Sequence, residues 1–197
     1  HVVKLDLINQ RMIANAMEPR ACAAQWTAAT KDMTVWTTSQ NPHIIRFGLS
    51  AVTLPMLDEH KLRVISPDVG GGFGSKIFHY PEEVIVPWIA MKINRPCKWV
   101  ATRSESFMTD SQGRDHVQKC KMALKSDGTM TGLYAELHAD MGAYLSSIAP
   151  LIPTVICITL FSGLYKNPGI WGETTGTLTN TVPVDAYRGA GRPEASY

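Results

Sequence analysis

The sequence lacks closely spaced cysteines, a large excess of either charge and a long uninterrupted apolar run. Its four cysteines lie far apart, which argues against a zinc knuckle or a disulfide scaffold and suits a reducing compartment. The net charge of +2 comes without a cluster of lysine and arginine, so nucleic-acid binding is not indicated. The apolar stretch at residues 148–164 contains Pro150, Pro153 and Gly163 and is too short to span a membrane. These absences predict a cytoplasmic protein without a membrane span.

A chain of 197 residues with 45% hydrophobic and 18% charged residues is expected to bury a core. Its length suits one domain or two small ones. The chain begins in strand-like sequence without an initiator methionine and stops soon after the motif-like residues 185–192. We therefore expect residues 1–197 to form a fragment of a longer polypeptide.

The order of apolar and polar residues predicts strands that alternate with helices, without an internal repeat. Runs of β-forming residues or strict alternation indicate the strands, and two alternating segments flank a Ser-Asp-Gly turn and should form a hairpin. The strands are expected at residues 2–8, 33–39, 62–65, 97–101, 120–124, 133–141 and 173–182. The predicted class is α+β, with mixed sheets and packed helices.

Three helices are expected from prolines, caps and apolar spacing. Asn41-Pro42 supplies an N-cap and a first-turn proline for the first helix. Pro81 opens the second, and the third is expected at residues 151–164. The apolar face of the second helix should consist of Val84, Ile85, Trp88, Ile89 and Met91.

Residues 69–76, Val-Gly-Gly-Gly-Phe-Gly-Ser-Lys, form an unusual segment. Glycine takes positive φ angles and lets the backbone approach another group closely, and consecutive N–H groups form a nest for an anion. A P-loop would need Ser or Thr after its Gly-Lys pair, whereas Ser75-Lys76 is followed by Ile77. A dinucleotide fingerprint that starts at Gly70 would need a third glycine where Ser75 stands. We therefore expect a binding loop of another kind.

The glycine loop at residues 70–76 is one of three motifs in this chain. The other two are Thr-Ser-Gln-Asn at residues 38–41 and Asp-Ala-Tyr-Arg-Gly-Ala-Gly-Arg at residues 185–192. In their order and separation they resemble the molybdenum hydroxylases, the family of xanthine dehydrogenase, aldehyde oxidase and aerobic carbon monoxide dehydrogenase. The resemblance covers nearly the whole chain and points to the molybdopterin-binding large subunit. It is strongest to carbon monoxide dehydrogenase-like large chains without the copper-binding cysteine.

The resemblance implies roles for the first two motifs. Gln40 matches the glutamine whose side-chain amide donates a hydrogen bond to an oxo ligand of molybdenum, a task that suits a neutral donor. From the residues alone, Gln40 would instead cap the helix that follows it. Gly71, Gly72, Phe73 and Gly74 match the loop beside the metal and the pterin, where N–H groups face oxygens of the cofactor. Without the resemblance, Phe73 would be read as a core residue.

The third motif contains Arg188, which matches an arginine beside the metal site. Its guanidinium presents a fixed fork of donors that suits pterin or phosphate oxygens. The alternative is a structural arginine that bonds to carbonyls of its own loop. Gly189 lets the backbone pass close to the same group.

Several charged residues near these motifs have open roles. Glu18 is expected either to line the cavity or to pair with Arg20. Lys76 is expected to pair with a phosphate or another chain segment, or to be exposed with an acidic partner. The six histidines show no spacing typical of metal ligands, and no side chain is expected to bind the metal directly.

Departures from the family pattern reduce the range of candidate substrates. Carbon monoxide dehydrogenases carry a copper-binding cysteine where this chain has Gly189, so no copper is expected. Purine-oxidising enzymes carry a glutamate and an arginine where this chain has Ile77 and Ile156, which makes purines poor candidates. Together with Phe73 and Ala190, these residues predict an apolar substrate pocket for aldehydes or heteroaromatic rings.

The resemblance implies an oxidoreductase that hydroxylates an electrophilic carbon of a small molecule with oxygen derived from water. Molybdenum–molybdopterin, expected in its cytosine dinucleotide form, would pass electrons to iron–sulfur clusters and FAD on partner subunits or domains. The catalytic base of the family lies outside these residues, so the fragment is expected to be inactive alone. A non-catalytic anion-binding or structural module that uses the glycine loop is the alternative.

Overall fold

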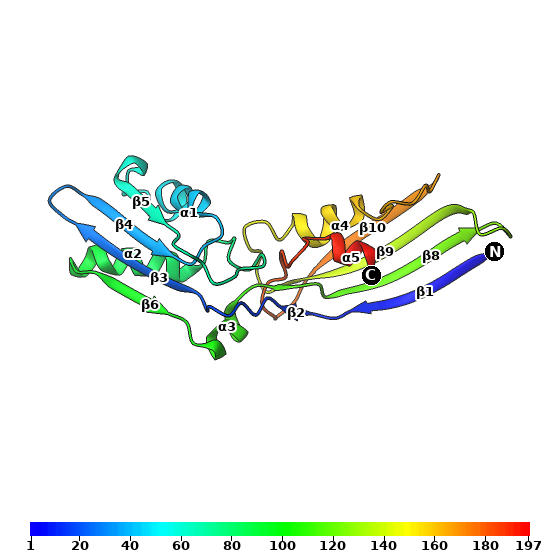
Figure 1. Cartoon of the computed structure of the whole chain (residues 1–197), viewed down its shortest axis with the longest axis horizontal. Coiled ribbons are helices and arrows are strands. Elements are labelled where there is room, and N and C mark those ends of the chain that lie inside the picture. The colour runs from blue at the N-terminus through cyan, green and yellow to red at the C-terminus, as the bar shows by residue number, and fades with distance from the viewer. The chain divides into compact units, whose positions relative to one another are not determined.

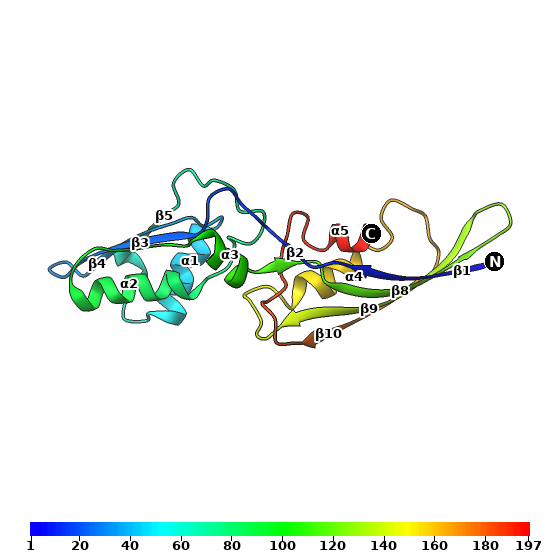
Figure 2. The same ribbon diagram turned by 90° about the horizontal axis from the view of Figure 1, so that it is seen from below.

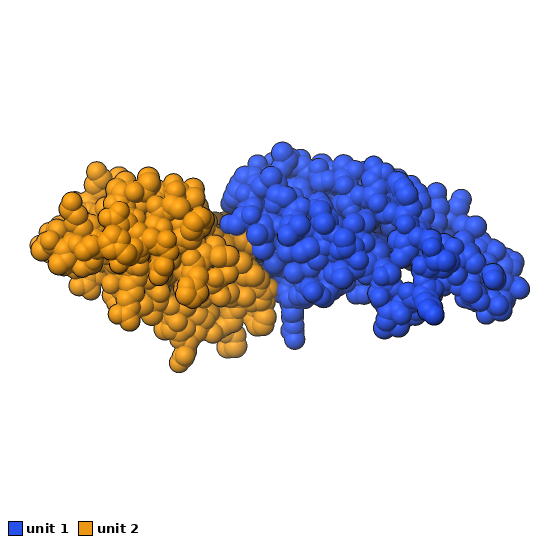
Figure 3. Space-filling view, turned by 90° about the horizontal axis from the view of Figure 1, so that it is seen from above, with its two compact units in different colours: residues 1–14, 110–197 blue, residues 15–109 orange.

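The computed structural model describes the whole chain from His1 to Tyr197 and divides it into two compact units. Unit 2 consists of residues 15–109, and unit 1 combines residues 1–14 with residues 110–197 (Figure 3). Each unit has its own sheet and its own buried cluster. None of the helices has the length and the apolar character that a membrane crossing requires.

Unit 2 is a four-stranded sheet covered by helices. The strands lie in the order β5 (Leu62–Ile65), β4 (Asp32–Thr37), β3 (Ala21–Thr27) and β6 (Cys97–Val100). β3 pairs antiparallel with β4 and β6, whereas β5 runs parallel to β4. The connections supply the helices α1 (Pro42–Gly48), continued by a π-helix at Leu49–Thr53, α2 (Pro81–Ile93) and α3 (Arg103–Thr109), with a 3-10 turn at Glu59–Lys61.

Both α1 and α2 bury apolar side chains in the same cluster as the sheet. Ile45 of α1 and Val86 of α2 join Cys22, Met33 and Val35, which point to one face of strands β3 and β4. Figure 2 shows α2 running along this sheet. The glycine loop lies between β5 and α2, so a packed sheet and a packed helix fix its two ends.

Unit 1 is a second four-stranded sheet, shown in Figure 1. Its strands lie in the order β1 (Val2–Asn9), β8 (His116–Leu124), β9 (Met130–Gly142) and β10 (Ile170–Leu178). The hairpin predicted around the Ser-Asp-Gly turn is confirmed, because β8 and β9 pair antiparallel. β10 runs parallel to β9, and a small ribbon joins β2 (Met12–Ile13) to β7 (Gln112–Gly113).

Short helical segments cover part of this sheet. They are a π-helix at Leu151–Ile156, α4 (Cys157–Thr159) and α5 (Arg192–Ser196). Cys157 of α4 packs with Ala135 and Leu137 of β9, and Ala195 of α5 packs against the same cluster. The α+β class with mixed sheets and packed helices is therefore confirmed.

Three details of the sequence prediction are wrong. The third helix ends at Thr159 instead of residue 164 and begins as a π-helix, in which Pro153 has no backbone N–H to donate. The last strand covers Ile170–Leu178, not residues 173–182. The fully buried face of α2 consists of Glu83, Val86, Pro87 and Ala90. Of the expected apolar face, Val84 and Met91 pack against the core while partly buried, whereas Ile85 and Trp88 are exposed.

Candidate functional site

The glycine loop turns tightly through residues with positive φ angles. The φ angle is +93° at Gly71, +54° at Phe73 and +106° at Gly74. The Ser75 N–H donates to the Gly72 carbonyl at 3.1 Å and closes the turn. Positive φ costs little at glycine but is unfavourable for a bulky aromatic residue, and such strain is concentrated at functional sites.

The Gln40 side chain lies against this loop. Its Oε1 accepts a hydrogen bond from the Gly74 N–H at 2.8 Å. A Cβ atom added to Gly72 would lie 2.3 Å from the same oxygen, so glycine at this position makes room for the glutamine. Because the amide oxygen is used as an acceptor, the amide nitrogen is left as a donor. Donation to an oxygen of a cofactor requires this orientation.

The helix-capping alternative for Gln40 is wrong. Asn41 is the N-cap residue of α1, and its Oδ1 accepts a hydrogen bond from the Ile44 N–H at 3.4 Å. The Gln40 backbone N–H donates to the Lys76 carbonyl at 2.8 Å. This bond ties the segment after β4 to the end of the glycine loop.

Phe73 is not a core residue, because 44% of it is exposed. A Cβ atom added to Gly71 would lie 3.0 Å from the ring carbon Cε2, which places the ring directly beside the loop backbone. Burial of apolar area therefore does not account for this strained aromatic residue. Ile77, the other predicted pocket residue of unit 2, is half-buried and donates its N–H to the Gly74 carbonyl at 3.2 Å.

Lys76 is buried and bonded to another segment of the chain. Its Nζ donates to the Glu18 carbonyl at 2.8 Å and to Glu18 Oε2 at 3.2 Å. The same carboxylate oxygen accepts the Gly70 N–H at 2.7 Å, so Glu18 fastens both ends of the glycine loop. The exposed position considered for Lys76 is wrong, as is the pairing of Glu18 with Arg20. Arg20 pairs with Glu82 at 2.8 Å instead.

The third motif forms a second strained loop, which belongs to unit 1. The φ angle is positive at four consecutive residues, with +21° at Arg188, +121° at Gly189, +49° at Ala190 and +89° at Gly191. Left-handed conformations normally occur as single residues, because they are unfavourable for residues with a Cβ atom. Contacts with the surrounding chain must therefore hold this loop in place.

Arg114 holds this loop from inside. Its Nη1 donates to the Tyr187 carbonyl at 2.8 Å and to Glu194 Oε1 at 2.9 Å, and its Nη2 donates to the Arg188 carbonyl at 3.3 Å. The side chains of Arg114 and Glu194 are only 8% and 1% exposed. Sequence reasoning missed Arg114, and no local signal marks it, because its partners lie 73 to 80 residues later.

Arginines other than Arg188 make the hydrogen bonds to the carbonyls of this loop. Arg114 bonds to two carbonyls of the loop, and Arg192 Nη1 donates to the Gly189 carbonyl at 3.0 Å. The Arg188 side chain is exposed and makes no hydrogen bond or ion pair within the chain. Its fork of donors is therefore not used to build the loop.

Ile156 lies beside the same loop. A Cβ atom added to Gly191 would lie 2.9 Å from Ile156 Cγ2 and 3.0 Å from the Ile152 carbonyl. Gly191 thus allows the loop to pack directly on the π-helix at Leu151–Ile156. Within unit 1 the structure brings together Ile156 and the loop that contains Arg188 and Ala190. Their contact with a cofactor or substrate stays a prediction.

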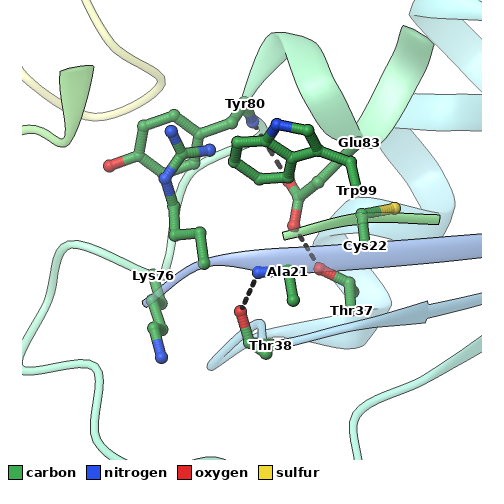
Figure 4. A pocket seen from close by; sticks show the side chains of 9 residues that line it. Ala21, Cys22, Thr37, Thr38, Lys76, Tyr80, Glu83 and Trp99 are labelled. Atoms are coloured by element: carbon green, nitrogen blue, oxygen red, sulfur yellow. Dashed lines mark hydrogen bonds between the residues drawn. The ribbon is translucent and has the colours of Figure 1, made fainter. Parts of the chain in front are cut away.

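A small polar pocket lies behind the glycine loop in unit 2. Its volume is about 10 Å³, which is room for a single water molecule. Figure 4 shows the side chains that line it: Arg20, Ala21, Cys22, Thr37, Thr38, Lys76, Tyr80, Glu83 and Trp99. This pocket is too small for a cofactor or substrate, so we interpret it as part of the support of the loop.

Burial shifts the pKa values of several groups. It raises the pKa of Glu83 to about 7, against the opposing effects of hydrogen bonds from Thr37 and Tyr80 and of the Arg20 charge. Burial also raises the pKa of Asp185 in unit 1 to about 7. The pKa values of the Cys22 and Cys157 thiols rise to about 12, mainly through burial, so these thiols stay protonated and unreactive.

No three His, Cys, Asp or Glu side chains are grouped to hold a metal ion.

The raised pKa of Glu83 predicts a pH dependence of stability. The pKa is about 7 in the folded chain against 4.5 for an unperturbed glutamate, so the folded state binds more protons between these values. The free energy of unfolding of unit 2 should therefore fall by about 3 kcal/mol as the pH rises from about 4.5 to about 7. The measurement is hydrogen exchange of the α2 amides in the complete protein, corrected for intrinsic rates. Glu83→Gln should remove most of the slope, and an equal slope in that variant would contradict the assignment.

Comparison with known proteins assigns the chain to a family. The sequence matches the molybdopterin cofactor-binding domain over residues 1–197. It is 32% identical over 195 residues to the nicotine 6-hydroxylase large subunit of Paenarthrobacter nicotinovorans, covering 97% of this chain and 23% of that protein. It is 34% identical over 173 residues to the carbon monoxide dehydrogenase large chain of Hydrogenophaga pseudoflava, covering 87% of this chain and 21% of that one.

The structure shows the same relationship. Quinoline 2-oxidoreductase from Pseudomonas putida 86 superposes with a TM-score of 0.92 at 31% identity, over 97% of this chain and 24% of that one. The chain therefore spans about a quarter of the length of these relatives. The resemblance inferred from the three motifs is confirmed, and this chain belongs to the molybdopterin cofactor-binding domain family of the molybdenum hydroxylases.

Proposed function

We propose that the complete protein is a molybdenum-dependent oxidoreductase that hydroxylates a carbon centre of a small aromatic N-heterocycle or an aldehyde. The observation that carries this proposal is the orientation of the Gln40 amide, whose oxygen accepts the Gly74 N–H and whose nitrogen is left to donate. When bound, molybdenum–molybdopterin supplies the two-electron oxidation that inserts oxygen from water. The residues of this chain bind and orient it.

Each of the two loops, taken by itself, has features that suit an oxygen-rich cofactor that the backbone must approach closely. In unit 2, Gly72 has no space for a Cβ atom beside Gln40, and the strained Phe73 presents an exposed ring. In unit 1, the guanidinium of Arg188 is exposed and makes no hydrogen bond to the loop, and Gly189 has no side chain that would keep another group away from the backbone. We assign hydrogen-bond donation to Gln40 and Arg188 and a wall of the substrate pocket to Phe73.

We infer the substrate class from the residues predicted to line the substrate pocket and from the relatives. Ile77, Ile156 and Ala190 offer no polar group to a purine, which favours a less polar ring. Two of the relatives are named for nicotine and quinoline, both of which contain an aromatic nitrogen heterocycle. We therefore rank N-heterocycles above aldehydes, and both above xanthine.

Metal and pterin analysis of the purified complete protein tests the proposal. Molybdenum with a pterin, release of a cytosine nucleotide on hydrolysis, and hydroxylation of a quinoline or pyridine with oxygen from labelled water are the expected results. Absence of both molybdenum and pterin would favour the alternative of an anion-binding or structural module. We expect residues 1–197 alone to be inactive even with added cofactor, since the base is expected to lie elsewhere in the protein.

We further propose that electrons leave to iron–sulfur clusters and FAD on partner subunits. Relatives named as a large subunit and as subunit gamma of a dehydrogenase complex support partners of this kind. Co-purification of subunits with iron–sulfur and flavin absorbance would agree with the assignment. The four free thiols are compatible with a cytoplasmic location.

The third proposal is a site without copper, which predicts poor oxidation of carbon monoxide. Soft thiolate ligands select Cu(I), and Gly189 offers none. A Cβ atom added at this residue would lie 2.7 Å from the Pro193 ring, and the φ angle is +121°, so Gly189→Cys should not gain copper either. Copper and molybdenum contents of both forms are measured beside carbon monoxide and N-heterocycle assays. Stoichiometric copper with rapid carbon monoxide oxidation in the wild type would refute the argument.

A further inference from the structure

Tyr80 is hydrogen-bonded to the backbone of the glycine loop. Its buried hydroxyl donates to the Ser75 carbonyl at 2.7 Å. The Ser75 hydroxyl in turn donates to the Gly72 carbonyl at 3.0 Å. Gly74, whose N–H orients the Gln40 amide, lies between these two fixed residues. The phenol hydroxyl therefore fixes the 75–76 peptide group, which lies two peptide groups along the chain from the one whose N–H orients Gln40.

Tyr80 is itself held on several sides. The guanidinium of Arg20 lies 3.7 Å from the centroid of its ring and 5.2 Å from that of Trp99. The Tyr80 N–H donates to Glu83 Oε2 at 3.0 Å, while Glu83 Oε1 accepts the Thr37 hydroxyl at 2.6 Å. Figure 4 shows these groups together in the polar pocket. A group that sets the geometry of a neighbour needs such support from a surrounding shell.

We propose that Tyr80 is a positioning residue for Gln40, acting through Ser75 and Gly74. This inference rests on the proposed function, in which the Gln40 amide donates to the cofactor. Without the Tyr80 hydroxyl, the Ser75 carbonyl loses a buried partner and the loop gains freedom. The Gly74 N–H then fixes the Gln40 amide less tightly, and the donor spends part of its time turned away.

Tyr80→Phe in the complete protein tests the positioning role, because it removes only the hydroxyl and keeps the ring beside Arg20. We expect kcat to fall roughly three- to tenfold, the effect of losing one hydrogen bond, with KM and molybdenum content unchanged. Hydrogen exchange of residues 70–77 should become faster, with or without cofactor. The matched control is Tyr134→Phe in unit 1, whose ring stacks on Trp171 at 4.5 Å and whose loss of a hydroxyl should change neither measurement.

A double-mutant cycle separates positioning from general support of the fold. If Tyr80 acts through Gln40, Tyr80→Phe should not lower kcat further in a Gln40→Ala protein. Two results would overturn the positioning role alone, provided that the wild type contains molybdenum and is active. One is the same fold-loss of kcat from Tyr80→Phe in the wild-type and Gln40→Ala backgrounds. The other is unchanged hydrogen exchange of residues 70–77 in Tyr80→Phe. A wild type without molybdenum would overturn the proposed function and this inference with it.

Discussion

Gln40→Ala is expected to lower the kcat of the complete protein roughly a hundred- to thousandfold, with a much smaller loss of molybdenum. The removal of one donor to an oxygen that gains charge in a transition state costs about 2.7–4 kcal/mol in other enzymes. The structure gives this donor a fixed direction, because the Gly74 N–H holds the amide oxygen at 2.8 Å. The measurement is kcat together with molybdenum per protein.

Gln40→Glu is the matched control for this prediction. Glutamate has the same length and still offers Gly74 an acceptor, but its carboxylate has no hydrogen to donate. We expect it to be about as slow as the alanine variant. Wild-type turnover in Gln40→Glu would show that the donor is not needed. Unchanged turnover in Gln40→Ala at full metal loading would leave Gln40 with a purely structural role.

Local patterns predicted much of the fold because their causes are local. The strand at Leu62–Ile65 has the predicted bounds, and Asn41 caps α1 as its type and the following proline indicate. The hairpin of β8 and β9 follows from strict alternation around one turn. In each case the deciding residues lie within a few positions of one another.

The buried face of α2 could not be predicted from its apolar residues. The helix has more apolar side chains than one face can hold, so their presence did not identify the side that meets the sheet. The structure buries Glu83, Val86 and Ala90, which recur at helical spacing. Glu83 is tolerated there because Thr37 and Tyr80 donate to its carboxylate.

The candidate site was predictable only in part, for the same reason. The glycine loop is visible in the sequence because its glycines are adjacent, but the sequence left Gln40 and Arg188 with structural alternatives. The structure removes these alternatives, since Asn41 is the helix cap and Arg114 bonds to the loop carbonyls. The residues that hold the two loops in place lie far away in sequence. For the glycine loop, for example, Glu18 bonds to Lys76, which follows 58 residues later. Sequence spacing carries no signal for such pairs.

Arg114→Met is expected to destabilise unit 1 by about 3–5 kcal/mol, because it leaves the Glu194 carboxylate buried without its cation. Two carbonyls of the strained loop also lose their donors, so hydrogen exchange of residues 187–195 in the complete protein should become faster by several orders of magnitude. Arg192→Met is the matched control. The Arg192 side chain is exposed and makes one hydrogen bond to the same loop, so its loss should cost about 1 kcal/mol or less.

The double variant Arg114→Met with Glu194→Gln identifies the cause of that loss. Removal of both charges should restore part of the stability, because replacing a buried ion pair is tolerated far better than breaking it. The strained φ angles at Arg188 and Ala190 should still relax, since neither replacement restores the donors to the Tyr187 and Arg188 carbonyls. The two measurements would thus give different results for the double variant. The free energy of unfolding would depend on the balance of buried charges, whereas the order of the loop would depend on the Arg114 guanidinium. A double variant as unstable as Arg114→Met would show that the lost carbonyl bonds, and not the unpaired carboxylate, dominate the energy.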